Sequence, residues 1–200
     1  RTWRMLVDTG PDETYPALRR RLLAIPPGAD GRRHIDLFVV THIDHDHIGG
    51  AHLLLGDADL RLSFGDVWFN APPRPRVRGV AEGESLAKIL GAPETSLPWN
   101  QAWSGGAVVS PANKGGVEDT ADGLPKLTVL SPTPERLEAL WKVWAKELEK
   151  LRRKERDKAE AERAPTRGAA LDLEALARKR TALDRAVPNG SSIAILLEPL

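Results

Sequence analysis

The sequence predicts an α/β fold, and three observations point to this class. Short apolar runs alternate with helix-like stretches over residues 3–70, so the order of elements reads β-α-β-α-β. The run from Ile35 to Val40 (I-D-L-F-V-V) is almost continuously apolar, as a strand covered on both faces requires. With 200 residues, of which 41% are hydrophobic, the chain is also long enough to bury a sizeable core.

The first half of the chain is divided into elements by its turn residues. The first apolar run ends at Asp8-Thr9-Gly10-Pro11, and Pro16 then begins a helix whose leucines recur on one face. A pair of glycines at positions 49 and 50 leads into a second helix. The predicted elements are strands at Trp3–Val7, Ile35–Val40 and Asp66–Asn70, and helices at Pro16–Leu23 and Gly49–Leu55.

The second half of the chain is less regular. From Ala71 to Gly123, Pro, Gly and Ser interrupt every period, which predicts loops with one helix near Ser85 to Leu90. Strands are predicted again at Leu127 to Leu130 (L-T-V-L) and at Ile193 to Leu197 (I-A-I-L-L).

A long helical segment separates these last two strands. Residues spaced three and four apart predict one apolar stripe, formed by Leu137, Leu140, Trp141, Trp144, Leu148 and Leu151. From Lys146 to Arg163, 14 of 18 residues are charged with both signs mixed, which favours a solvated helix over a nucleic-acid-binding arm. With a second helical pattern from Leu171 to Leu183, the segment is interpreted as an inserted hairpin. The predicted organisation is a core at 1–133, a hairpin at 134–186 and a return to the core at 187–200.

Composition excludes several classes of protein. The net charge of +1 creates no field that indicates nucleic acid or an anionic membrane as a global partner, so either would have to be recognised locally. Without cysteine, the chain has neither disulfides nor thiolate metal sites, which fits a cytoplasmic protein. No apolar run reaches the ~18 residues of a spanning helix, so no membrane partner is expected.

Potential metal-binding side chains are most concentrated directly after the second predicted strand, in T-H-I-D-H-D-H-I-G-G from Thr41 to Gly50. Three of the five histidines and two aspartates lie within this stretch, at the carboxyl end of a strand, where α/β folds place their sites. Imidazole and carboxylate groups coordinate divalent metals, and so many of them would repel or stay unpaired without a cation. A loop whose histidines only form hydrogen bonds is the less favoured alternative. The predicted metal ligands are His42, Asp44, Asp46 and His47, whereas His45 is expected to point away.

This stretch resembles the metal-binding motif of the metallo-β-lactamase-fold hydrolases, whose usual form is T-H-x-H-x-D-H-x-G-G. The preceding M-L-V-D-T-G-P is similar to the family's strand that carries an acidic residue under the site. The segments L-T-V-L-S-P-T and N-G-S-S-I-A-I-L-L-E resemble the branch related to the hydrolase domain of bacterial DNA-uptake channel proteins. The resemblance implies an αββα sandwich, of which this chain is expected to hold the N-terminal portion with a helical hairpin inserted.

The resemblance also implies metal-assisted hydrolysis at two divalent ions. Asp46 and His47 would bind one ion and act as the catalytic pair, while His42 and Asp44 would bind the other. Asp8 would orient a ligand imidazole from behind. Asp44 stands where the usual motif has histidine, giving H-x-D-x-D-H, and this hard oxygen donor shifts the expected metal from Zn²⁺ toward Mn²⁺ or Mg²⁺.

The expected substrate is a phosphodiester in nucleic acid, because the uptake-channel branch implies it. Arg74, Arg76 and Arg78 are candidates for contacts with phosphate, with a plain surface loop as the alternative. Asn189 and Ser191 are candidates for substrate contact, or form a turn before the last strand.

Two other function classes stay open at this stage. The domain could be a regulated effector subunit of a multi-component assembly, such as a defence system, with Trp141 and Trp144 docking a partner. It could also be a small-ester or lactam hydrolase, which the fold permits. In the family, further metal ligands follow the last predicted strand, so they are expected from residues beyond Leu200 or from another protein chain that completes the site.

Overall fold

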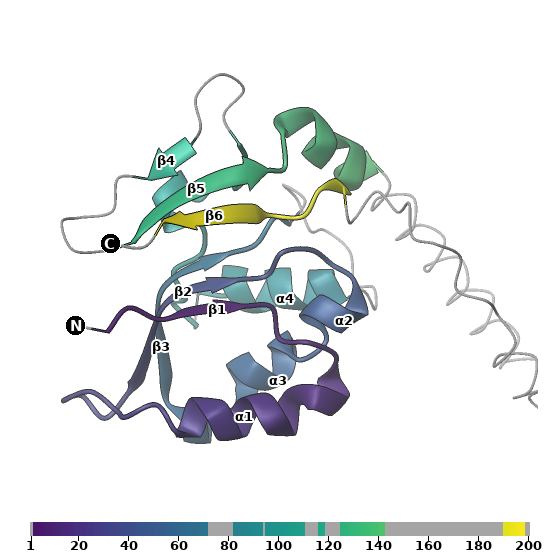
Figure 1. The fold of residues 1–200 in the computed structure, drawn as a ribbon. Helices are drawn as coiled ribbons and strands as arrows, with labels where there is room; N and C mark the ends of the chain where they lie inside the picture. Colours follow the sequence, from purple (N-terminus) through teal and green to yellow (C-terminus); the bar gives the residue numbers. More distant parts are fainter. Residues whose placement is uncertain are drawn as a thin grey trace, which may run out of the picture.

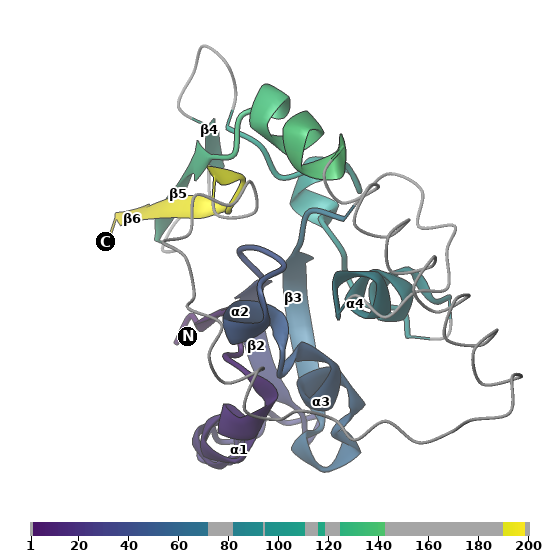
Figure 2. The same cartoon turned by 90° about the vertical axis from the view of Figure 1, so that its right-hand side faces the viewer.

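The computed structural model describes residues 2–71, 82–93, 95–110, 116–118, 125–142 and 190–198. Within these residues the elements form three layers, with helices on one face of a parallel sheet and an antiparallel sheet on its other face (Figure 1). A view turned by 90° shows β5 and β6 above β2, with α1 and α3 below it (Figure 2). The predicted α/β class is therefore confirmed.

The parallel sheet has the order β1-β2-β3 and consists of β1 (Met5–Val7), β2 (Arg33–Val39) and β3 (Leu62–Trp68). The helix α1 (Tyr15–Leu23) connects β1 to β2, and α3 (Ala51–Gly56) lies between β2 and β3. These five elements confirm the predicted β-α-β-α-β order.

The central strand β2 is buried on both faces, as its apolar run predicts. Phe38 and Val40, each 0% exposed, belong to the core that packs between the parallel sheet and the helices. Leu37 and Val39 belong to a second core, which lies between the two sheets and includes Val129. Because successive side chains of a strand alternate between its faces, one strand supplies both cores.

Two elements of this half differ from the prediction. The strand β3 begins at Leu62, four residues before the predicted start at Asp66, because Leu62 already pairs with Arg33 of β2. A four-residue helix, α2 (His45–Ile48), lies inside the histidine cluster, between the predicted strand that ends at Val40 and the predicted helix that begins at Gly49. No repeating apolar pattern in the sequence marks either of these two elements, so their bounds could not be read from it.

The antiparallel sheet has the order β4-β5-β6, with β4 at Gly116–Glu118, β5 at Lys126–Ser131 and β6 at Ala194–Glu198. The strand β4 lies in the stretch that was expected to be loop, whereas β5, β6 and the helix α4 (Glu82–Gly91) confirm the predicted elements. Three short 3-10 helices, η1 (Asp12–Thr14), η2 (Ala58–Leu60) and η3 (Gln101–Trp103), complete the connections.

The first turns of the predicted long helix pack on the domain itself. Residues 134–142 are helical, and Leu137 and Leu140, which are 1% and 2% exposed, belong to the same core as Phe38 and Val40. Trp141 packs against the same core, so the described part of the apolar stripe covers its own domain. Trp144 and the rest of the hairpin lie outside the described residues, so the domain boundaries at 134 and 187 stay predictions. No helix of the described segments is long and apolar enough to cross a membrane.

Candidate metal centre

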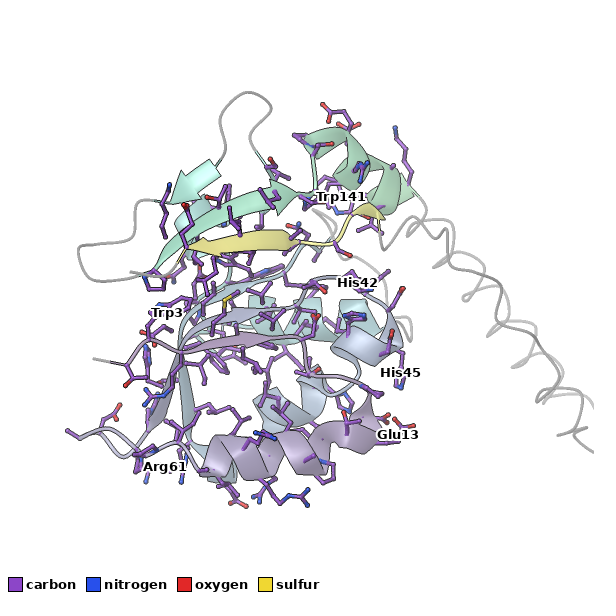
Figure 3. All side chains as sticks on the ribbon, in the orientation of Figure 1. Trp3, Glu13, His42, His45, Arg61 and Trp141 are labelled. Carbon is purple, nitrogen blue, oxygen red and sulfur yellow. The ribbon has the colours of Figure 1, made fainter. Side chains whose placement is uncertain are left out.

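The strands of the parallel sheet bring the expected site residues to one edge. Asp8 directly follows β1, and His42 lies three residues after the end of β2. Since β1 and β2 are parallel with Val7 opposite Val39, their carboxyl ends lie side by side. Figure 3 shows His42 at this end of the sandwich, beside the short helix α2.

His42 is held in a buried position by its neighbour Thr41. Its side chain is 5% exposed, and Nδ1 lies 2.9 Å from the hydroxyl oxygen of Thr41. The other ring nitrogen, Nε2, is buried and has no hydrogen-bond partner among the residues that the structure describes. Burial is the main cause that lowers the pKa of His42, followed by the nearby His47, and both causes favour the neutral imidazole. A neutral imidazole with a free Nε2 is the form that binds a metal.

His47 is oriented by Asp8. Its Nδ1 lies 2.8 Å from Asp8 Oδ2, and its ring centroid is 3.9 Å from that of His42. The same carboxylate accepts hydrogen bonds from the backbone N–H of Thr41 at 2.7 Å and from its hydroxyl at 2.8 Å. An imidazole whose Nδ1 faces a carboxylate presents Nε2 on its opposite side, as in the carboxylate–histidine–metal arrangement of many metalloproteins.

The four expected ligands form two pairs, each with one imidazole and one carboxylate. Nε2 of His42 lies 3.5 Å from Asp44 Oδ2, and Nε2 of His47 lies 3.6 Å from Asp46 Oδ2. Two donors of one tetrahedral ion are about 3.4 Å apart when each bond is about 2.1 Å long. The separations in both pairs therefore fit a shared cation. Although Asp44 occupies the N-cap position of α2, its side chain forms no capping hydrogen bond.

The loop after β1 is fastened to α2 by backbone and side-chain contacts. The backbone N–H and the hydroxyl of Thr9 both donate to the carbonyl of His47, at 2.9 and 3.0 Å. A Cβ on Gly49 would lie 3.0 Å from the backbone nitrogen of Asp12, so the two segments approach closely only because this residue is glycine. The close approach of these two segments, and not a positive φ, explains why residue 49 is glycine.

Asp8 itself adopts the left-handed region, with a φ of 57°. Such a conformation costs a non-glycine residue roughly 1 kcal/mol, although aspartate tolerates it better than most. The backbone N–H and the hydroxyl of Thr41, together with the contact with His47, hold the carboxylate in this position.

His45 does point away from these pairs, as expected. Its Nε2 lies 3.3 Å from Asp12 Oδ1 and 3.8 Å from Glu13 Oε2, and all three residues are exposed. His45 and Glu13 are labelled in Figure 3. These three are the one group in the described part of the chain whose donor atoms, three or more, all lie within 4.8 Å of one another. Exposed acidic groups of this kind commonly occur without a metal.

Of the candidate substrate-contact residues, only Ser191 lies within the described residues. Arg74, Arg76, Arg78 and Asn189 lie outside the described residues. Ser191 is 2% exposed, and two residues later the backbone N–H of Ile193 donates to the carbonyl of Thr41. The segment before β6 therefore runs beside the residue that precedes His42.

Thr41 is the residue that sequence reasoning did not single out. Its hydroxyl oxygen lies within hydrogen-bond distance of both Asp8 and His42, so it joins the two strand ends. The sequence feature that could have identified Thr41 is its position between the end of β2 and the first histidine of the cluster.

Residues 4–63 match the metallo-beta-lactamase superfamily. The matched span contains β1, α1, β2 and the histidine cluster, including Asp8 and all four expected ligands. This match to the superfamily, together with a mixed α/β fold built on a parallel sheet, supports a metal-dependent hydrolase in general terms. Neither curated proteins nor solved structures give a significant match to the chain.

Replacing Asp8 by asparagine is expected to weaken metal binding by about 10- to 100-fold without unfolding the domain. Asparagine tolerates the left-handed backbone but offers one acceptor oxygen instead of two, so it cannot serve both Thr41 and His47 as the carboxylate does. A chelator-competition titration with Zn²⁺ and Mn²⁺ measures the change. Asp59→Asn is the matched control because that side chain is 84% exposed and pairs with Arg19. Equal affinities for the two variants would contradict the role of Asp8.

Proposed function

We propose that this domain is a metal-dependent phosphodiesterase that acts on nucleic acid through a dinuclear centre. The observation that carries the proposal is the pair of imidazole–carboxylate contacts at the carboxyl edge of the parallel sheet, His42 with Asp44 and His47 with Asp46. Each contact would hold one divalent cation, leaving the other coordination positions to water, substrate or ligands from outside the described residues.

Two divalent cations in such a centre supply an activated water and neutralise the charge that develops on the reacting group. The chain's own residues hold and shield the centre. His42 and Thr41 close its buried side, because His42 is 6% exposed as a whole residue. Asp46 lies on the open side, with 75% of its side chain exposed. A substrate can therefore approach from the side of Asp46 and α2.

The donor set supports a phosphate ester as the substrate. Asp44 and Asp46 give the centre two hard carboxylates, which suit Mn²⁺ or Mg²⁺, and these ions in turn suit phosphate oxygens. The resemblance of the surrounding segments to the DNA-uptake branch favours nucleic acid among phosphodiesters. We further propose that Arg74, Arg76 and Arg78 contact its phosphates, which a lower salt dependence of binding in the triple alanine variant would test.

A substrate panel tests the proposal. The purified protein is incubated with DNA, RNA, cyclic nucleotides, phosphate monoesters, a thioester and a chromogenic lactam, with Mn²⁺, Mg²⁺ and Zn²⁺ in turn. Cleavage of DNA or RNA that requires metal supports the proposal, with Mn²⁺ expected to give the highest rate. Turnover of the lactam or the thioester without phosphodiester cleavage would defeat it. No turnover of any substrate in the panel would favour an effector subunit that requires a partner.

Replacing Asp44 by histidine is expected to retain metal and to shift the preference toward Zn²⁺ over Mn²⁺. The change restores a nitrogen donor, which Zn²⁺ favours relative to harder ions. Metal content is measured after dialysis against an equimolar mixture of the two ions. Asp59→His serves as the control, because it adds an imidazole at an exposed position away from the centre. An unchanged Zn²⁺ to Mn²⁺ ratio, or loss of both metals, would contradict the assignment of Asp44.

A further inference from the structure

We propose that the Thr41 hydroxyl is a positioning group that sets the tautomer of His42, and so keeps Nε2 of this imidazole open for a cation. The functional role of this tautomer rests on the proposed metal centre. The tautomer itself depends only on hydrogen bonds within the chain, so it can be measured in metal-free protein.

The direction of the hydrogen bonds follows from the number of protons available. A threonine hydroxyl has one proton, and an ionised carboxylate only accepts hydrogen bonds. Thr41 Oγ1 lies 2.8 Å from Asp8 Oδ2 and 3.1 Å from Asp8 Oδ1, so the hydroxyl proton is donated to Asp8.

The same oxygen must then accept from His42. Thr41 Oγ1 lies 2.9 Å from His42 Nδ1, and its only proton already points to Asp8. The contact is a hydrogen bond only if His42 Nδ1 carries the proton. In a neutral imidazole this leaves a lone pair on Nε2, the buried atom for which the described part of the chain offers no hydrogen-bond partner.

The alternative tautomer would close the site. With its proton on Nε2, His42 would donate toward Asp44 Oδ2, which is 3.5 Å away, and a small ring movement would turn this contact into a hydrogen bond. That bond would occupy both a nitrogen and an oxygen that a cation needs. The Thr41 hydroxyl opposes this state because it would lose its donor at Nδ1.

Asp8 extends the arrangement to the second pair. Its Oδ2 accepts from Thr41 at 2.8 Å and faces His47 Nδ1 at 2.8 Å, so the proton of His47 also lies on Nδ1. One hydroxyl and one carboxylate thus orient both imidazoles with Nε2 toward Asp44 and Asp46. Of the two, only the Thr41 contact acts on His42.

The test compares Thr41→Val with Thr41→Ser and with Thr9→Val. Valine keeps the shape of threonine but has no hydroxyl, whereas serine keeps the hydroxyl. Thr9→Val is the matched control, because Thr9 is also close to the centre but its hydroxyl contacts backbone carbonyl groups and no imidazole. Long-range ¹H–¹⁵N correlation spectra of ¹⁵N-histidine-labelled, metal-free protein at about pH 8 report the tautomer of each neutral imidazole.

The expected result is the Nδ1–H tautomer for His42 in the wild type, in Thr41→Ser and in Thr9→Val. In Thr41→Val, a substantial Nε2–H population is expected at His42, with metal affinity about 10- to 100-fold weaker in a chelator competition with Mn²⁺ or Zn²⁺. An Nε2–H tautomer in the wild type would overturn the inference even if Thr41→Val failed to fold. Unchanged tautomer and affinity in a folded Thr41→Val would overturn it as well. If the tautomers behave as expected and no phosphodiester is cleaved, the proposed function fails while the role of Thr41 stands.

Discussion

Replacing His47 by alanine is expected to abolish metal-dependent hydrolysis while leaving the domain folded. The side chain is 34% exposed and its ring contacts Asp8 and His42, so its removal opens no core cavity. The cation that His47 and Asp46 would share loses its nitrogen donor. Because an activated water contributes several kcal/mol to the transition state, and each 1.36 kcal/mol corresponds to tenfold in rate, the expected loss is about 10³-fold or more.

Three measurements separate this effect from a folding defect. The initial rate is measured on the best substrate of the panel, the metal content by elemental analysis, and the fold by thermal unfolding. His52→Ala is the control of the same residue type, since His52 is exposed on α3. Full activity in His47→Ala would remove this residue from the centre. An equal loss of activity in His52→Ala would show that the assay responds to general destabilisation.

Replacing Phe38 by alanine is expected to lower the free energy of unfolding by about 3–5 kcal/mol. Phe38 is 0% exposed at the middle of the parallel sheet, and its ring centroid lies 5.8 Å from that of Phe64 on β3. Truncation removes apolar contacts with both the sheet and the helices beneath it, and leaves a cavity that the surrounding layers cannot fill. Urea unfolding monitored by tryptophan fluorescence gives the change in midpoint.

The matched control is Leu197→Ala on β6. Leu197 is 48% exposed, so its truncation is expected to change the free energy of unfolding by less than about 1 kcal/mol. A loss of comparable size in both variants would show that β6 is covered in solution by a partner. A loss below about 1 kcal/mol for Phe38→Ala would contradict the placement of β2 between two cores.

Elements with a strong local pattern were predicted from the sequence alone. The apolar run of β2 predicted a strand covered on both faces, and the proline and leucines of α1 predicted its helix. The early start of β3 and the presence of β4 were not predicted. Ser63 and Gly65 interrupt the apolar pattern of β3, and pairing with β2 determines that segment. For β4, pairing of Val117 with Thr128 of β5 makes the strand.

The sequence by itself determined which donors are available, because His42, Asp44, Asp46 and His47 lie within six positions and need no distant contact to be close. Only the tertiary structure decided how they are oriented. Thr41 and Asp8 are 33 residues apart, and they meet because β1 and β2 pair in parallel and end at the same edge. Hydrogen bonds between their side chains then direct both imidazoles. Such bonds depend on positions in space to within a few tenths of an ångström, which strand pairing specifies and local sequence does not.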